Sequence, residues 1–138
     1  MTASRPEDLE ALRAACLAEK EQAMFYKALT GAAEEAGDVR LAERLNELLA
    51  DEHHHLSRLT ARLIELGEVA PDLSAVRQPP ATLEDWEIVA RAREHAEVER
   101  YTRLAGAALD AATAALIEEI LRVEREHEQN LAGKWTAA

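Results

Sequence analysis

The chain has 138 residues, enough to bury one core but too few for two, and its formal net charge at pH 7 is -11. This acidity argues against a nucleic-acid partner and against binding to anionic membranes, because both need a basic face. No run approaches the roughly 20 apolar residues that span a bilayer, and the N-terminus has no apolar segment typical of a signal peptide. We therefore expect one domain, residues 1–138, in the cytoplasm.

The composition predicts an all-α domain. Glycine and proline are few (five and four residues), and the body is rich in Ala, Leu, Glu and Arg, which favour helices. The single cysteine, Cys16, excludes an internal disulfide and a Cys-x-x-Cys metal site within the chain. Because Cys16 falls on an apolar stripe with Leu9 and Leu12, we expect it to be a small buried residue.

The first predicted helix spans about 5–36. Ser4 with Glu7 three residues later, and Pro6 in the first turn, predict a capping-box start. Its core stripe advances in steps of three and four residues, which places a glutamate and a tyrosine on the core side. The stripe consists of Leu9, Leu12, Cys16, Glu19, Ala23, Tyr26 and Thr30.

The second predicted helix spans about 38–66. Gly37 and Asp38 predict a tight turn that makes the first two helices antiparallel. The stripe of this helix is Leu41, Leu45, Leu48, Glu52, His55, Leu59 and Leu66. A connector at 67–81, with Pro71, Pro79 and Pro80, predicts an ordered, non-helical crossover.

The third and fourth helices are predicted at about 82–109 and 111–133. Thr82 and Asp85 are candidate caps for the third, and the fourth begins near Asp110 or Thr113. The third helix's stripe is Leu83, Glu87, Ala90, Glu94, Glu97, Tyr101, Leu104 and Ala108, and the fourth presents Leu116, Ile117, Ile120, Leu121, Glu124, His127 and Leu131. Two hairpins joined by one long link predict a four-helix bundle with ferritin-like connectivity.

One pattern of metal-ligand residues occurs twice. A glutamate is followed seven residues later by a tyrosine and, about thirty residues further on, by Glu-x-x-His. Glu and His three apart point the same way from a helix, so two facing copies would form a cage for two metal ions. The copies are Glu19, Tyr26, Glu52, His55 and Glu94, Tyr101, Glu124, His127.

The cost of burying carboxylates favours a metal. Several glutamates lie on stripes that should be apolar, and very few Lys or Arg share those stripes to neutralise them. Divalent cations would supply the missing positive charge. A donor set of carboxylates with a few imidazoles suits iron or manganese, whereas a closed zinc site favours Cys and His.

These motifs resemble the di-iron domain of rubrerythrins over nearly the whole chain, from about Leu9 to His127. The matching segments are residues 19–26, residues 51–55, Glu94 with Glu97 and Tyr101, and residues 124–127. The resemblance implies a centre of two iron ions, with manganese or mixed metals left open. It implies as metal ligands Glu19, Glu52, Glu94, Glu124, His55 and His127.

The resemblance also assigns roles around this centre. Glu97 resembles the extra rubrerythrin ligand that alternates with a histidine on one iron, although it could instead be a solvated residue paired with Arg93 or Arg100. Its counterpart in the first helix is Gln22, so we expect an asymmetric site. Tyr26, Tyr101 and Glu97 are the candidate catalytic residues. The two tyrosines are expected to donate hydrogen bonds to ligand carboxylates, with plain core packing as the alternative. We expect three histidines at the surface: His53, His54 and His95. Of these, His54 could touch the edge of the site.

The implied function is a rubrerythrin-like di-iron oxidoreductase that reduces hydrogen peroxide. Full-length rubrerythrins carry a rubredoxin-type domain with four cysteines, so with one cysteine this chain would need an external electron-donor protein. One alternative is a ferroxidase or other iron-handling protein acting with oxygen, although cage-forming ferritins usually have a further short helix after the fourth. Further alternatives are an oxygen-activating hydroxylase and a non-catalytic metal-binding bundle. The resemblance also implies a homodimer.

Overall fold

The computed structural model describes residues 5–131. They form four helices: α1 (Pro6–Glu35), α2 (Val39–Glu65), α3 (Trp86–Ala105) and α4 (Ala111–Asn130). There is no strand among the described residues, which confirms the all-α prediction. None of the described helices is long and apolar enough for a membrane span.

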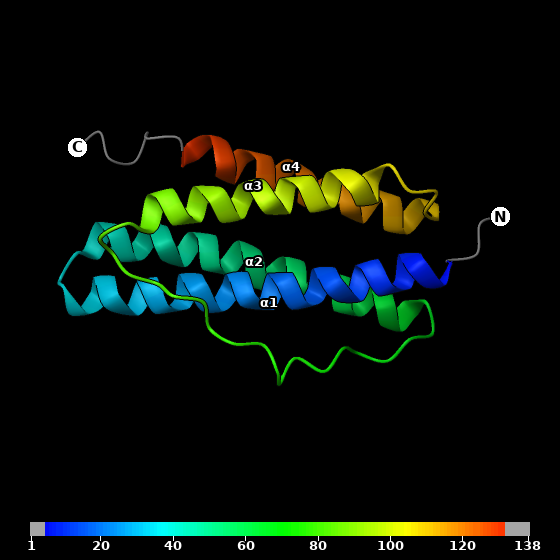
Figure 1. Ribbon diagram of the computed structural model, residues 1–138, viewed down its shortest axis with the longest axis horizontal. Helices are drawn as coiled ribbons and strands as arrows, with labels where there is room; N and C mark the ends of the chain where they lie inside the picture. Colours follow the sequence, from blue (N-terminus) through cyan, green and yellow to red (C-terminus); the bar gives the residue numbers. More distant parts are fainter. Residues whose placement is uncertain (1–4, 132–138) are drawn as a thin grey trace.

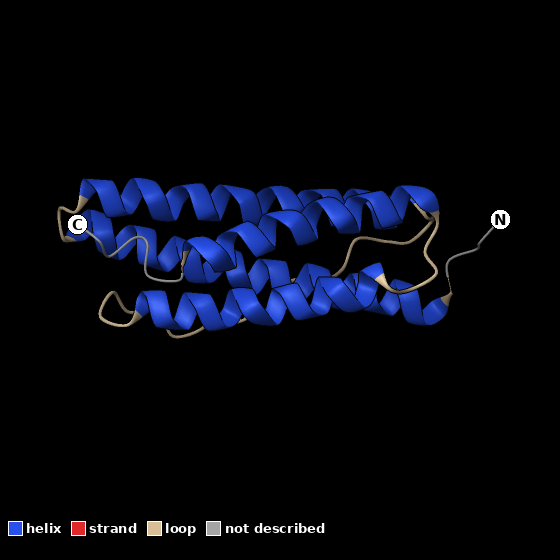
Figure 2. Cartoon of the chain, turned by 90° about the horizontal axis from the view of Figure 1, so that it is seen from above, coloured by secondary structure: helices blue, strands red, loops and turns tan. Residues whose placement is uncertain are grey.

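The helices pack as two antiparallel hairpins, α1 with α2 and α3 with α4 (Figures 1 and 2). The connection after α2 runs back along the bundle, so α3 starts at the end where α2 began (Figure 1). Helix α1 also contacts α3, and α2 contacts α4. This is the ferritin-like connectivity with one long crossover that the sequence predicts.

The largest error in the predicted boundaries concerns α3, which is shorter than the expected 82–109. The hydroxyl of Thr82 donates a 2.7 Å hydrogen bond to Asp85, and residues 83–85 form a turn before the helix begins. At the other end Gly106 is the C-cap, which leaves Ala108 exposed beyond the helix. Helix α4 ends at Asn130, with Leu131 as its C-cap, and the rest of its predicted end lies outside the described residues.

The N-caps of α2, α3 and α4 are residues that the sequence predicts at these helix starts: Asp38, Asp85 and Asp110. Asp38 accepts a hydrogen bond from the Leu41 amide, and Asp110 accepts one from the Thr113 amide, as N-cap aspartates do. The predicted capping box of α1 is wrong, because its N-cap is Arg5, whose side chain makes no capping bond. Ser4, the predicted cap, lies outside the described residues. At Asp85, the N-cap of α3, the side chain also makes no capping bond.

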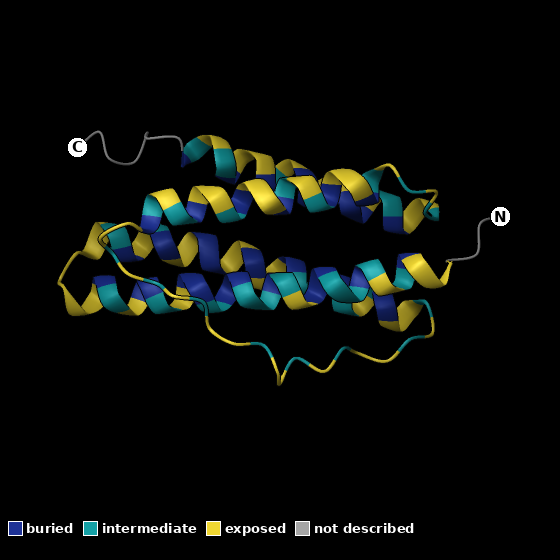
Figure 3. Ribbon diagram, in the orientation of Figure 1, coloured by how far each residue is buried: buried dark blue, intermediate teal, exposed yellow. Residues whose placement is uncertain are grey.

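Buried positions recur along all four helices (Figure 3), and the apolar ones form two clusters. The first, here the Phe25 cluster, includes Phe25, Leu29, Leu45, Leu48, Trp86 and Leu131. The second, here the Ile117 cluster, includes Leu12, Leu59, Leu63, Leu104, Ile117 and Ile120. Along every helix the members of one cluster are separated from those of the other by buried polar residues. The chain therefore has a polar layer at mid-bundle between two apolar ends.

Candidate metal centre

All four helices contribute to the polar layer. Helices α1 and α3 each provide a glutamate, and α2 and α4 each provide a glutamate and a histidine three residues later. The four carboxylate residues are 0% exposed and the two histidines 4% exposed. The structure thus brings together the six predicted ligands: Glu19, Glu52, His55, Glu94, Glu124 and His127.

Their donor atoms form two overlapping groups. In each group one oxygen or nitrogen per residue lies within 4.8 Å of the others. One group is Glu19, Glu52, His55 and Glu124; the other is Glu52, Glu94, Glu124 and His127. Since Glu52 and Glu124 occur in both groups, the geometry suits two neighbouring cations with these two carboxylates between them.

Both histidines turn Nδ1 toward the carboxylates. His55 Nδ1 lies 3.2 Å from Glu52 Oε1 and 3.7 Å from Glu19 Oε2. His127 Nδ1 lies 3.1 Å from Glu124 Oε1 and 3.4 Å from Glu94 Oε1. Each Nδ1 therefore lies close to two of the three carboxylates in its own donor group.

The unpaired polar atoms of the layer fit a metal. Several buried donor atoms have no hydrogen-bond partner among the described residues, and a group left so costs about 1–3 kcal/mol. Burial, and then the neighbouring carboxylates, raise the pKa of Glu52 and of Glu124 well above the usual range. Oxygen and imidazole donors at this spacing suit divalent iron or manganese. The unpaired atoms are Glu19 Oε1, Glu52 Oε2, Glu94 Oε1, Glu124 Oε1 and Oε2, and His127 Nδ1.

The surroundings of His127 favour its protonated, positively charged form. Burial lowers its pKa, but the hydrogen bond with Asp51 and the neighbouring carboxylates of Glu124 and Glu94 outweigh this effect and raise it to about 12. Its Nε2 lies 2.8 Å from Asp51 Oδ2, and this hydrogen bond lowers the pKa of Asp51. The Asp51 contact fixes the ring so that Nδ1 faces the layer.

The two tyrosines bond across the hairpins. Tyr26 of α1 donates a 2.6 Å hydrogen bond to Glu94 of α3, and Tyr101 of α3 donates one of the same length to Glu19 of α1. Burial, followed by the charge of the bonded glutamate, raises both tyrosine pKa values well above normal. The phenols therefore keep their protons and remain hydrogen-bond donors.

Glu97 lies beside the layer but belongs to neither donor group. It is 7% exposed, and its Oε1 has no hydrogen-bond partner among the described residues. Burial, followed by the charge of Glu19, raises its pKa to about 8. Its nearest ion-pair contact is weak, with Arg100 Nε 3.9 Å from Oε2. Glu97 is thus a buried carboxylate, unlike the solvated alternative.

The remaining sequence candidates lie outside the layer. His53, His54 and His95 are exposed, and His95 Nδ1 lies 2.8 Å from Glu128 Oε2. Cys16 is fully buried, and burial raises its pKa to about 11, which disfavours the thiolate.

Asp51 was missed by the sequence reasoning. An acidic residue directly before the glutamate of a Glu-x-x-His is a weak signal, because helix surfaces carry many acidic residues. The second copy of the pattern has Val123 at the corresponding position, so the repeat did not reveal it either.

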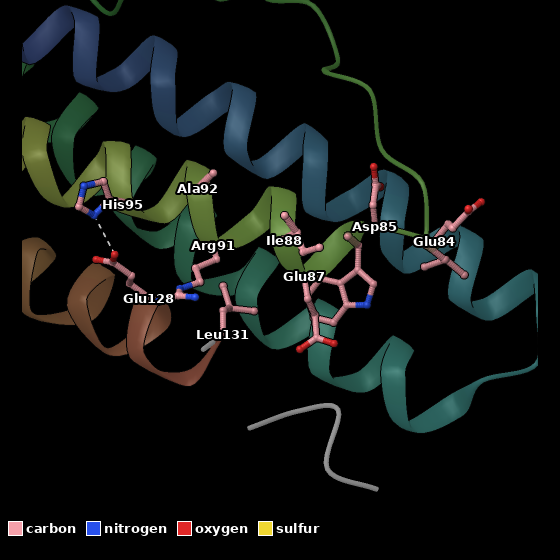
Figure 4. A pocket seen from close by; sticks show the side chains of 11 residues that line it. Glu84, Asp85, Glu87, Ile88, Arg91, Ala92, His95, Glu128 and Leu131 are labelled. Carbon is pink, nitrogen blue, oxygen red and sulfur yellow. Dashed lines mark hydrogen bonds and ion pairs between the residues drawn. The ribbon is translucent and has the colours of Figure 1, made fainter. Parts of the chain in front are cut away.

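A surface pocket lies along α3 (Figure 4). Its volume is about 920 Å³, and its lining includes Trp86, Ile88, Arg91, His95 and Leu131. None of the residues that line it belongs to the two donor groups.

Comparison with known proteins agrees with this arrangement. A family model described as Rubrerythrin matches residues 10–134. The bacterioferritin-related protein of Bacteroides fragilis, described as a dodecameric thioferritin, is 24% identical with a TM-score of 0.80, covering 94% of this chain and 84% of its own. Bacterioferritin BfrA of Mycobacterium tuberculosis is 21% identical with a TM-score of 0.85, covering 98% and 87%.

A third solved structure is the bacterioferritin of Desulfovibrio desulfuricans, whose description names a diiron site. It is 20% identical with a TM-score of 0.83, covering 94% of this chain and 78% of its own. At these identities the likeness to solved structures shows the fold. No curated protein matches the chain.

Proposed function

Because this chain belongs to the rubrerythrin family of ferritin-like di-iron proteins, we propose that it reduces hydrogen peroxide to water with electrons from an external donor. The observation that supports this choice is Glu97, a buried residue beside the polar layer whose Oε1 has no hydrogen-bond partner in the described part of the chain. The resemblance to rubrerythrins gives that residue the role of an additional, exchangeable iron ligand.

The residues of the layer have distinct roles in this proposal. Glu52 and Glu124 would help to hold both iron ions, since both belong to both donor groups. Glu19 with His55 would complete one position, and Glu94 with His127 the other. We keep iron as the leading metal and manganese as an alternative, because the donor set suits both.

The reaction needs two electrons and two protons for each peroxide molecule, and it releases two molecules of water. Bound ferrous iron would supply the two electrons, one from each ion. Glu97 is the proton-holding group we assign to the chain, because burial raises its pKa to about 8 and its Oε1 has no partner among the described residues. Tyr26 and Tyr101 would orient Glu94 and Glu19 while keeping their own protons.

The apolar ends of the bundle would limit access of water to the layer. The Phe25 cluster and the Ile117 cluster flank it, and its glutamates are fully buried. A dry site strengthens the interactions between the carboxylates and a cation. The proposal also includes an electron-donor protein, a homodimer and a cytoplasmic location.

A second candidate is ferroxidase activity, with ferrous iron as substrate and oxygen as oxidant. The observation that favours it is the likeness of the fold to bacterioferritins, with TM-scores of 0.80 to 0.85. In that reaction the same carboxylates would bind iron and then release it for storage.

The two candidates differ in their oxidant and in their iron stoichiometry. The protein would be loaded anaerobically with two ferrous ions per chain and mixed with peroxide or oxygen in a stopped-flow spectrometer. Faster oxidation by peroxide, slowed in Glu97→Gln, supports peroxide reduction. Faster oxidation by oxygen that continues beyond two ions per chain would replace this proposal with the ferroxidase. Glu99→Gln, an exposed glutamate on the same helix, is the matched control.

A further inference from the structure

The two halves of the polar layer differ at one pair of equivalent positions. The offset of 75 residues that relates Glu19 to Glu94 also relates Gln22 to Glu97. Glu97 Oε1 is buried and has no hydrogen-bond partner within residues 5–131, whereas Gln22, 1% exposed, is hydrogen bonded at both ends of its amide. The repeat is therefore broken by a neutral, fully engaged side chain.

Arg93 sets the orientation of the Gln22 amide. Its Nε donates a 2.7 Å hydrogen bond to Gln22 Oε1. A guanidinium only donates hydrogen bonds, so the amide must present its oxygen to Arg93 and its NH2 group to the other side. That group donates a 3.2 Å hydrogen bond to Glu94 Oε2, the oxygen that also accepts from Tyr26.

Arg93 is itself held in place by α1. Its Nη2 donates a 2.8 Å hydrogen bond to Glu21, and its guanidinium lies 5.1 Å from the centre of the Phe25 ring. The side chain is 23% exposed, so one end of the network reaches the surface. A chain of contacts thus runs from a surface cation through one amide to a buried carboxylate.

We propose that Arg93 and Gln22 are positioning residues that fix Glu94, leaving its Oε1 for metal and making the Glu94–His127 position the tighter of the two metal positions. The inference rests on the metal site of the proposed function. It concerns the order in which the two positions fill, whichever oxidant the protein uses. Glu19 lacks this support, because the residue in the place of Gln22 is the carboxylate Glu97.

The variant Arg93→Ala distinguishes two roles of Arg93: orienting the Gln22 amide, or acting only as a positive charge near the metal site. If Arg93 acted only as a nearby positive charge, Arg93→Ala would strengthen cation binding. If it orients Gln22, the same change weakens binding, because the amide is then free to turn its oxygen toward Glu94. The two explanations predict effects of opposite sign.

The test is a titration of the metal-free protein with Co²⁺ alone, followed by visible absorbance and calorimetry. The wild type is expected to bind two ions in two steps, with the tighter step lost in His127→Gln and the weaker one lost in His55→Gln. Arg93→Ala and Gln22→Ala are expected to weaken the tighter step about 10- to 100-fold, as loss of an orienting contact to a ligand does. Arg93→Lys should recover part of the loss.

The matched control is Arg91→Ala, which removes the same charge from an exposed position of the same helix. It should leave the tighter step unchanged. Unchanged or tighter binding in Arg93→Ala would overturn the positioning role while leaving the metal site intact. Absence of stoichiometric Co²⁺ binding in the wild type would overturn the metal site as well. If Gln22→Ala does not fold by circular dichroism, the partly exposed Arg93 variants decide the question.

Discussion

Tyr101 of α3 donates a 2.6 Å hydrogen bond to Glu19 of α1, which lies in the other hairpin. Tyr26 makes the reciprocal bond from α1 to Glu94. These two bonds join the hairpins through the carboxylates proposed to bind metal. The relative placement of the hairpins and the orientation of the ligands are therefore set by the same contacts.

The tyrosine bonds should contribute unequally to metal binding. Glu94 Oε2 accepts hydrogen bonds from both Tyr26 and Gln22, so in Tyr26→Phe it still accepts the one from the Gln22 amide. Glu19 Oε2 loses its tyrosine donor in Tyr101→Phe. We expect Tyr101→Phe to lower Co²⁺ affinity about 10-fold or more, and Tyr26→Phe to lower it less. Equal losses measured by calorimetry would contradict the proposed difference.

The stability of the metal-free protein should fall as the pH rises. The pKa of Glu97 in the folded state is about 8, above the ordinary value of 4.5, so the fold favours its protonated form. The resulting stabilisation is complete below about pH 4.5 and disappears as the pH rises through 8. The raised pKa values of Glu52 and Glu124 act in the same direction.

Thermal unfolding in the presence of a chelator checks this pH dependence. The unfolding temperature should decrease from pH 5 to pH 9, and Glu97→Gln should make the decrease shallower. Each pKa unit of difference corresponds to about 1.4 kcal/mol, so the Glu97 contribution is on the order of a few kcal/mol. A constant or rising unfolding temperature over this range would show that the buried carboxyls do not govern stability.

Removal of a shared carboxylate should cost both metal ions. Glu52 and Glu124 belong to both donor groups, whereas Glu19 and Glu94 belong to one each. Iron bound per chain should fall from two ions to none in Glu52→Ala and Glu124→Ala, and from two to one in Glu19→Ala and Glu94→Ala. Elemental analysis of the purified variants measures this.

Glu118→Ala, at an exposed position of α4, is the control for these variants and should keep both ions. Unchanged iron content in Glu52→Ala and Glu124→Ala would remove the shared carboxylates from the site. The metal-free Glu52→Ala protein should be no less stable than the wild type, since a buried carboxyl with an unpaired oxygen has been removed.

Asp51 should strengthen metal binding through His127. Its Oδ2 lies 2.8 Å from His127 Nε2, and this contact holds the opposite ring nitrogen toward Glu94 and Glu124. Asp51→Asn is expected to weaken the Co²⁺ binding step that involves His127 about 10-fold and to leave the other step unchanged. Glu43→Gln, an exposed change on the same helix, should leave both steps unchanged. Equal weakening of both steps would argue for a general effect of charge.

Sequence periodicity predicted the helices and the composition of the polar layer because both depend on the same spacing. Steps of three and four residues put Glu19 and Tyr26 on one face, and the structure buries both. The start of α3 was missed because residues 82–85 form a hydrogen-bonded turn that also resembles a helix start. A local sequence signal does not distinguish the N-cap itself, Asp85, from the candidate cap three residues upstream, Thr82.

The contacts around the layer could not be predicted in the same way. The tyrosine bonds cross from one hairpin to the other, and so does the bond from Arg93 to Gln22. Such contacts depend on how far each helix is rotated and shifted relative to its neighbour, which the spacing within one helix does not specify. Asp51 was missed for the same reason, because its partner His127 lies on α4.

The division of the core into the Phe25 cluster and the Ile117 cluster bears on how the molecule opens. Each end of the bundle has its own apolar packing, so the ends can remain folded while the middle fluctuates. In the metal-free protein the central turns, whose buried polar atoms lack hydrogen-bond partners among the described residues, would then exchange amide hydrogens faster than the turns at either end. Bound metal would reverse this order, so that the amides in the middle of the bundle would exchange most slowly.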